Sequence, residues 1–356
     1  MHADIVVLPG DGIGPEVTAA AVEVLRAVAR RYGHQFRFDQ KLIGGAAIDA
    51  TGTPLPADTL DAAQAADAIL LGAVGGPKWS DPNAKVRPEQ GLLAIRKALG
   101  LFANLRPVKP HVAGLGASPI KPHLLQGVDL VVVRELTGGI YFGRKQRTGD
   151  SASDLCEYSV VEIERVVRHA AALARSRSGR LTSVDKANVL ETSRLWRDVT
   201  TRIVRDEFPD VTLEHQLVDS MAMHLIAKPR AYDVIVTENM FGDILSDLAA
   251  SVGGGIGLAP SSSLGAGRPG LYEAIHGSAP DIAGTGKANP TATILSASMM
   301  LRDLGETAAA DAVEASVIRL LEEGPVTPDL GGSATTDEFG SAVARAVQTA
   351  AEVISR

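Results

Sequence analysis

Short apolar strands alternate with helices along this chain, and this alternation restricts the possible folds more than any other feature. A strand at residues 5–8 leads into a glycine-rich turn and a helical pattern over residues 18–31. An extended segment at 35–40, a helical pattern at 58–66 and a buried strand at 68–74 follow. Strand and helix in this order predict an α/β fold.

A pair of carboxylates follows one of the later strands. The β-branched run at residues 232–237 precedes the sequence ENMFGDILSD, in which Asp243 and Asp247 are four residues apart. On a helix this spacing places both side chains on one face, just past a strand end where open α/β sheets bind ligands. By itself such a pair is more often a solvated helix face than a cation site.

Other chemically capable residues also lie at the ends of predicted strands. Asp219 follows the strand at 211–217, and with Asp243 and Asp247 it makes three oxygen ligands that suit Mg²⁺ or Mn²⁺. Lys186 lies where a strand becomes a helix and is a candidate base, although most lysines are surface residues. Tyr141, beside two glycines, is either a proton donor or a packing aromatic.

Three arginines are candidates for binding carboxylates. Arg106 and Arg134 end apolar strands, and Arg96 lies on a predicted helix at 87–99 beside Leu92 and Leu93. The planar guanidinium forms two parallel charge-assisted bonds to a carboxylate, so arginines that converge favour a small polyanionic substrate. The alternatives are solvated arginines and an ordinary amphipathic helix.

Composition excludes several classes of protein. The 356 residues allow two domains, and the net charge of -7 lacks the basic stripe that nucleic acid would require. One cysteine, Cys156, excludes an intrachain disulfide framework. With neither a secretory signal nor an apolar run of membrane-spanning length in the sequence, we expect no membrane partner and a cytoplasmic location.

Two glycine-rich segments differ in what they predict. The turn at 10–16, GDGIGPE, does not match a dinucleotide fingerprint, because Pro15 lacks a donor and Glu16 adds a negative charge. It predicts a tight turn lining a site. The segment at 253–265 is expected to be a flexible crossing into the first domain, and the small residues at 273–290 predict a long functional loop.

Five motifs together carry a family resemblance. They lie at residues 10–16, 134–141, 185–189, 238–247 and 276–284, and they resemble the β-decarboxylating dehydrogenases of the isocitrate/isopropylmalate family over essentially the whole length. The resemblance implies an open mixed sheet in two lobes, unlike a Rossmann fold. Residues 1–101 with 254–356 would form a cofactor-binding domain, and 102–253 a domain for the metal and for dimerisation.

The resemblance also implies a reaction. A 2-hydroxy-3-carboxy acid would be oxidised by NAD⁺, lose CO₂ and be reprotonated at the resulting enolate. Arg96, Arg106 and Arg134 would hold carboxylates, while Asp219, Asp243 and Asp247 would carry Mg²⁺ or Mn²⁺ as a Lewis acid that chelates the substrate. Lys186 would accept the hydroxyl proton and Tyr141 would help to return one. Lys186 and Asp219 would act from the partner subunit of a homodimer, where Asp219 would also contact substrate.

Cofactor and substrate preference follow from further matching positions. The resemblance assigns cofactor binding to residues 76–89 and to the long loop. The residues expected to contact the cofactor are Gly76, Glu89, Glu273, His276, Gly277, Ser278, Ala279, Pro280, Asp281, Ile282 and Asn289. Asp281 would accept ribose hydroxyls and repel a 2′-phosphate, which favours NAD⁺ over NADP⁺.

Leu92 and Leu93 resemble the members that act on 3-isopropylmalate, with Val189 of the partner chain opposite. The expected activity is its oxidative decarboxylation to 4-methyl-2-oxopentanoate, a step of leucine biosynthesis. A relative acting on malate, tartrate or homoisocitrate is the nearer alternative, and a non-catalytic module is the farther one.

Overall fold

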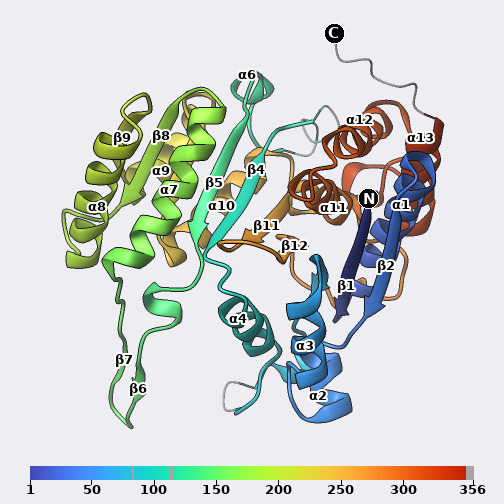
Figure 1. Ribbon diagram of the computed structural model, residues 1–356, viewed down its shortest axis with the longest axis horizontal. Coiled ribbons are helices and arrows are strands. Elements are labelled where there is room, and N and C mark those ends of the chain that lie inside the picture. The colour runs from blue at the N-terminus through green and yellow to red at the C-terminus, as the bar shows by residue number, and fades with distance from the viewer. Residues whose placement is uncertain (82–83, 112–115, 117, 350–356) are drawn as a thin grey trace. The chain divides into compact units, whose positions relative to one another are not determined.

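The computed structural model describes residues 1–81, 84–111, 116 and 118–349, and the chain forms two compact units (Figure 1). The first unit contains Met1–Leu99, His111–Ala117 and Gly254–Arg356. The second contains Gly100–Pro110 and Ser118–Gly253. Strands and helices alternate in both units, so the predicted α/β class is confirmed.

The first unit is built on five strands. In spatial order they are β2 (Gln35–Gln40), β1 (His2–Gly10), β3 (Ala68–Ala73), β12 (Gly270–Ala274) and β11 (Pro260–Leu264). Neighbours pair in parallel except β11 and β12, which are antiparallel. The sheet is therefore mixed, as the family resemblance implied.

Helices bury the apolar side chains of this sheet. They are α1 (Gly14–Tyr32), α2 (Gly44–Thr51), α3 (Ala57–Ala65), α4 (Pro88–Ala98), α11 (Thr291–Asp303), α12 (Thr307–Glu323) and α13 (Thr336–Thr349). Small and branched side chains of α1, α11, α12 and α13 pack with those of β1 and β3 in one core, in which Phe339 is a rare aromatic. The core thus depends on Ala, Val, Leu and Ile.

Helix α2 begins with two consecutive glycines, Gly44 and Gly45. Gly44, its first residue, has φ 74°, and glycines are weak helix formers, so the local signal opposes a helix. The Asp11 side chain accepts hydrogen bonds from the backbone N–H groups of Gly45 and Ala46 at 2.8 and 2.7 Å. A carboxylate distant in sequence therefore caps this helix.

The prediction of a flexible crossing at residues 253–265 was wrong for its second half. Pro260–Leu264 form strand β11. Its serines, residues 261–263, are buried and have weak β-propensity, so local sequence concealed the strand. Pairing with β12 and hydroxyl bonds stabilise it: Ser261 Oγ and Ser296 Oγ both donate to the Glu273 carbonyl, at 3.0 and 2.8 Å. Glu273 accordingly belongs to a strand.

In the second unit, five strands of the described residues lie in the large sheet. Their order is β4 (Ala103–Val108), β5 (Leu130–Glu135), β10 (Val234–Thr237), β8 (Arg180–Asp185) and β9 (Thr212–Leu217). The pair β4 and β5 is antiparallel, and the others are parallel. The carboxyl ends of β5, β8, β9 and β10 thus lie at one edge, which is where the candidate residues follow.

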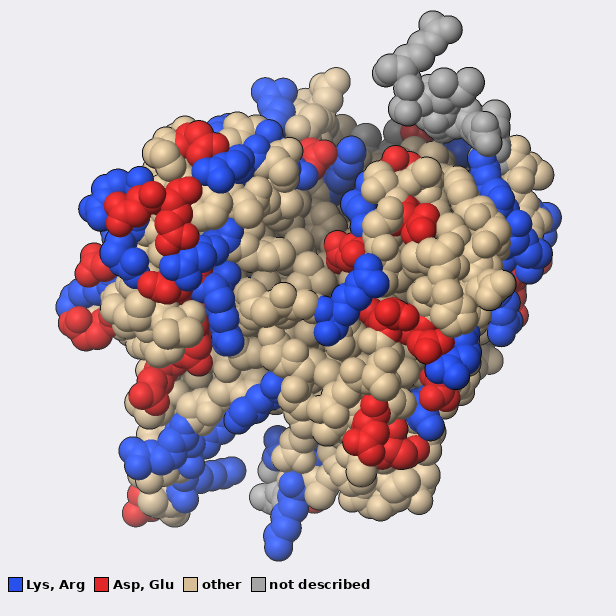
Figure 2. Space-filling view, in the orientation of Figure 1, with Lys and Arg blue, Asp and Glu red and all other residues tan. Residues whose placement is uncertain are grey.

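Helices of the second unit are α6 (Pro122–Leu125), α7 (Val160–Ser176), α8 (Glu191–Glu207), α9 (Val218–Ala227) and α10 (Asn239–Val252). Helices α7 and α8 pack apolar faces around Trp196 against the strands. Their outer faces carry interspersed acidic and basic side chains, as Figure 2 shows, including the ion pairs of Arg168 with Glu164 and Glu207.

A hairpin of β6 (Lys145–Arg147) and β7 (Ala152–Asp154) extends from the second unit, with Lys145, Arg147 and the other strand residues exposed (Figures 1 and 2). Within the described part of the chain, no helix has the length and apolarity needed to cross a membrane.

Candidate active site

Two aspartates and two arginines meet in the second unit. Helix α10 begins directly after β10, and Asp243 and Asp247 lie one turn apart on it. Arg106 on β4 and Arg134 on β5 are almost fully buried. The antiparallel pairing sets these strands side by side, so both guanidinium groups reach the same helix.

Each arginine bonds to a carboxylate. Arg106 Nη1 lies 3.1 Å from Asp247 Oδ1, and its Nη2 lies 3.6 Å from Asp243 Oδ1. Arg134 Nη1 donates to Asp243 Oδ1. The positive charges therefore compensate two carboxylates on neighbouring turns, which explains how the pair is tolerated.

Neutral side chains orient the guanidinium groups. Asn104 Oδ1 accepts from Arg106 Nε at 2.7 Å, and Ser246 Oγ accepts from Arg106 Nη1 at 2.8 Å. Asn239 Oδ1 accepts from Nε and Nη2 of Arg134 at 3.1 and 2.8 Å. Sequence reasoning missed these three residues, although Asn104 is two residues before Arg106 on a strand and so shares its face.

Tyr141 joins the same cluster. Its hydroxyl donates to Asp243 Oδ2 at 2.6 Å from the short helical turn η2 (Gly139–Tyr141). Partial burial, followed by the bond to Asp243, raises the pKa of the Tyr141 phenol. The phenol therefore stays protonated at neutral pH, as a proton donor must.

Lys186 and Asp219 form a second group in this unit. Lys186 Nζ lies 2.5 Å from Asp219 Oδ1, and this bond lowers the pKa of the exposed Asp219 carboxyl. In the part of the chain that the structure describes, no three His, Cys, Asp or Glu side chains gather in a metal-binding arrangement. Among the described residues, Asp219 therefore does not join Asp243 and Asp247 in such an arrangement.

The first unit holds the third arginine. Arg96 Nη2 lies 2.5 Å from Glu273 Oε1, and both side chains are buried. Leu92 and Leu93 precede it on α4 and are half-buried, with apolar surface available to a ligand. Glu89, in the first turn of the same helix, is exposed.

The long loop of the first unit has a mixed surface. Ser278 and Asn289 are buried, whereas Gly277, Pro280 and Asp281 are exposed and Ala279 and Ile282 are half-buried. Asn289 Nδ2 donates to Asp329 Oδ2 at 3.0 Å, which ties the end of the loop to the turn at Pro328–Leu330.

His276 on this loop has one ring nitrogen without a hydrogen-bond partner among the described residues. Its Nδ1–H donates to the Gly277 carbonyl at 2.9 Å, while Nε2 is buried and has no partner among the described residues. Burial lowers the pKa of His276, so the imidazole is neutral and Nε2 is an acceptor.

The other predicted cofactor segment begins at Gly76. A Cβ on the adjacent Gly75 would lie 2.8 Å from Glu89 Oε1, so the loop and α4 meet closely. The segment also includes Pro82 and Asn83, which lie outside the described residues.

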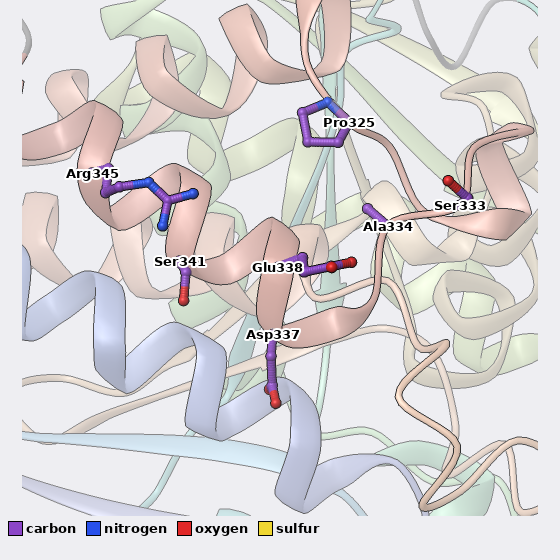
Figure 3. Close-up of a pocket in the computed structure, with 7 residues that line it drawn as sticks. All are labelled: Pro325, Ser333, Ala334, Asp337, Glu338, Ser341 and Arg345. Atoms are coloured by element: carbon purple, nitrogen blue, oxygen red, sulfur yellow. The ribbon is translucent and has the colours of Figure 1, made fainter.

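A separate groove of about 670 Å³ lies along α13 in the first unit (Figure 3). It contains none of the residues predicted from sequence. Its polar side chains bond to their surroundings: Glu338 accepts from the Thr335 N–H at 2.9 Å, and Ser341 donates to Glu23 at 3.0 Å.

Comparisons with known proteins show which family this chain resembles. The family profile for isocitrate/isopropylmalate dehydrogenase matches residues 4–343. A 3-isopropylmalate dehydrogenase of Rhodopirellula baltica is 57% identical over 96% of this chain and 98% of its own length. One from Geobacillus kaustophilus is 60% identical over 92% of this chain and 90% of its own.

Solved structures are also similar. An isocitrate dehydrogenase from Methylococcus capsulatus has a TM-score of 0.88 and 37% identity, covering 98% of this chain and 100% of that one. A β-decarboxylating dehydrogenase from Thermococcus kodakarensis has a TM-score of 0.80 and 36% identity, covering 98% and 96%. The chain therefore belongs to the isocitrate/isopropylmalate dehydrogenase family.

Proposed function

We propose that this chain catalyses the NAD⁺-dependent oxidative decarboxylation of 3-isopropylmalate to 4-methyl-2-oxopentanoate and CO₂, in leucine biosynthesis. High identity to relatives named 3-isopropylmalate dehydrogenase supports the proposal. The structural observation that supports it is the cluster of Arg106, Arg134, Asp243 and Tyr141, whose side chains have the chemistry needed to bind carboxylates, ligate a metal and donate a proton.

The arginines bind the substrate carboxylates. Arg106 and Arg134 are oriented by Asn104, Ser246 and Asn239, so little side-chain entropy is lost when a carboxylate binds. Arg96 contributes a third guanidinium, held by Glu273.

Asp243 and Asp247 would hold the divalent cation, together with Asp219 of the partner subunit. Carboxylate oxygens one helical turn apart form a donor set that suits a hard ion such as Mg²⁺ or Mn²⁺. When bound, the ion supplies Lewis-acid polarisation of the substrate hydroxyl.

Two side chains move protons. Lys186, as the neutral amine, would take the proton of the substrate hydroxyl when the substrate is oxidised. After CO₂ departs, the Tyr141 hydroxyl donates a proton to the carbon atom from which CO₂ was released. The raised pKa of Tyr141 keeps that proton in place until then.

The first unit binds NAD⁺. The open Nε2 of His276 accepts a hydrogen bond there, and the exposed Asp281 carboxylate accepts from the ribose hydroxyls. Gly76, Glu89, Glu273, Gly277, Ser278, Ala279, Pro280, Ile282 and Asn289 complete this site. Asp281 repels a 2′-phosphate, so NAD⁺ is preferred over NADP⁺.

Leu92 and Leu93 select the branched substrate. Burial of an isopropyl group contributes about 2 kcal/mol, which corresponds to a preference over malate on the order of tens of fold. Val189 of the partner subunit would cover the other side of the alkyl group.

The active unit is a homodimer in the cytoplasm. Met223, Ile226 and Ile244 are exposed on α9 and α10, which is the apolar surface that a partner would bury. The free thiol of Cys156 suits a reducing compartment.

The decisive assay follows NADH formation with Mn²⁺ and 3-isopropylmalate, isocitrate or malate. The proposal expects the highest kcat/KM with 3-isopropylmalate and a strong loss when NADP⁺ replaces NAD⁺. A higher kcat/KM with malate or isocitrate would overturn it.

A further inference from the structure

We propose that the turn between β1 and α1, residues 10–16, braces the NAD⁺-binding loops of the first unit, and that Glu16 is a positioning residue for the cofactor. This inference rests on the proposed function, since it concerns the same NAD⁺ site. The turn has no direct catalytic part in the reaction proposed above.

Glu16 holds the second half of the long loop. Its carboxylate accepts hydrogen bonds from the backbone N–H groups of Gly284 and Gly286, the latter at 3.1 Å. Both glycines have positive φ, 72° and 66°, a conformation that side-chain-bearing residues rarely adopt. Bonds from two amides to one carboxylate are charge-assisted, and they fix a segment that would otherwise have unusual backbone freedom.

Neighbouring residues of the turn hold the first half of the loop. The Ile13 N–H donates to the Ser278 carbonyl at 2.8 Å. A Cβ on Gly12 would collide with that carbonyl, so glycine permits the close approach. Ile13 and Val17 pack with Ala288, and Ala279 and Ile282 contact this small apolar cluster.

Asp11 extends the brace to the other cofactor segment. Its buried Oδ2 accepts from the Gly75 N–H at 2.8 Å, while the same carboxylate caps α2. Gly75 directly precedes Gly76, the first residue of that segment. One turn therefore bonds both to the long loop and to the residue that directly precedes the other cofactor segment.

The charge of Glu16 argues against direct contact with the cofactor. A carboxylate repels the pyrophosphate of NAD⁺, and both oxygens of Glu16 already accept backbone bonds. Its role is to order the loop before NAD⁺ arrives. Without it, binding would have to order the loop, and affinity would fall.

The test measures NAD⁺ binding by titration calorimetry on the full-length protein, alongside steady-state kinetics. Glu16→Ala removes both bonds, and Glu16→Gln keeps one acceptor. Glu23→Gln is the matched control, since Glu23 lies on the same helix and accepts a hydrogen bond from Ser341.

We expect Glu16→Ala to raise the Kd and KM for NAD⁺ about tenfold, with Glu16→Gln intermediate. The KM for 3-isopropylmalate and kcat should change little, and Glu23→Gln should match the wild type.

Two results would overturn the inference. One is an unchanged Kd for NAD⁺ in folded Glu16→Ala. The other, which needs no variant, is rapid hydrogen exchange at the Gly284 and Gly286 amides of the wild-type protein without NAD⁺. Failure of the wild type to bind NAD⁺ would instead contradict the proposed function.

Discussion

Asp243 is the residue at which the polar contacts of the second unit converge. Its two oxygens accept from Arg134 and Tyr141, and Arg106 approaches within 3.6 Å. A carboxylate held by three partners is already oriented, so a cation or substrate that binds there meets a formed site.

Replacement of this carboxylate gives the first prediction. Asp243→Asn replaces the proposed metal-binding carboxylate by an amide of nearly the same shape. Metal-dependent turnover should therefore be abolished, while the fold and NAD⁺ binding remain. Kinetics over an Mn²⁺ titration and calorimetry with NAD⁺ measure the two effects. Asp206→Asn, at an exposed carboxylate paired with Arg205, is the control and should retain activity. Normal turnover by Asp243→Asn at ordinary Mn²⁺ concentrations would contradict the metal assignment.

Asn239 gives the second prediction, because its amide makes two different contacts. Oδ1 accepts from Arg134, and Nδ2 donates to the Gly138 carbonyl at 3.1 Å, beside the turn that carries Tyr141. Asn239→Ala should raise the KM for substrate about tenfold, since a hydrogen bond that orients a charged group is lost.

Asn239→Asp separates the two contacts. It keeps the acceptor for Arg134 but loses the donor to Gly138, so we expect the greater damage in kcat. Thr200→Val, which removes a buried hydroxyl bond to the Trp196 carbonyl on α8, controls for general destabilisation. Equal effects of Asn239→Ala and Thr200→Val on KM would show that Asn239 only supports the fold.

Among the elements, α10 begins in an unusual environment. Glu238 caps it by accepting from the Phe241 N–H at 2.9 Å, yet the side chain is buried, and Tyr158 donates to it at 3.3 Å. Desolvation is the main cause that raises the pKa of Glu238, and the charge of the nearby Glu135 adds to it. The same desolvation raises the pKa of Glu135.

The third prediction follows from the sign of this shift. A carboxyl whose pKa is higher in the folded than in the unfolded state binds more protons when folded. The free energy of unfolding therefore falls as the pH rises above the unfolded value of about 4.3. Glu238→Gln keeps an oxygen for the helix cap and removes the titration. Urea unfolding should show Glu238→Gln gaining stability relative to wild type from pH 5 to pH 8, whereas a constant difference would refute the assignment.

Local pattern predicted most elements of the fold but not those that distant residues stabilise. Branched apolar runs revealed β3, β5 and β10, because burial on both faces leaves a clear signal. Helix α2 depends on Asp11, and the serine-rich β11 depends on β12 and α11. Such contacts join residues far apart in sequence, so no short window contains them.

The candidate site was predictable to a similar degree. Helical spacing placed Asp243 beside Asp247, because both lie within one element. Asn104 was missed, although it lies two residues before Arg106 on the same strand. The pairing of Asn239 with Gly138 joins separate elements and had no local signal. Glu16 was conspicuous as a charge in a glycine turn, but its partners lie more than 260 residues away.

At the scale of the whole molecule, the candidate catalytic and metal-binding residues of each chain form two groups. Asp243 and Asp247 lie with Arg106, Arg134 and Tyr141, whereas Lys186 pairs with Asp219. If Lys186 and Asp219 act on the partner's substrate, each site of a homodimer needs the first group from one subunit and the second group from the other.

The fourth prediction tests this division by complementation. Lys186→Ala and Asp243→Asn should each be inactive as homodimers. After the two variants are unfolded together and refolded, a mixed dimer should contain one site with Asp243 and Lys186 both intact. Random pairing makes half of the dimers mixed, so recovered activity should approach about a quarter of the wild-type value.

A mixture of Lys186→Ala with Asp219→Asn is the matched control, because both changes fall in the same group and every mixed site keeps one defect. Activity should return in the first mixture and remain absent in the second. If instead Lys186 and Asp219 both acted within their own chain, both mixtures would stay inactive, since each subunit would carry its own defect.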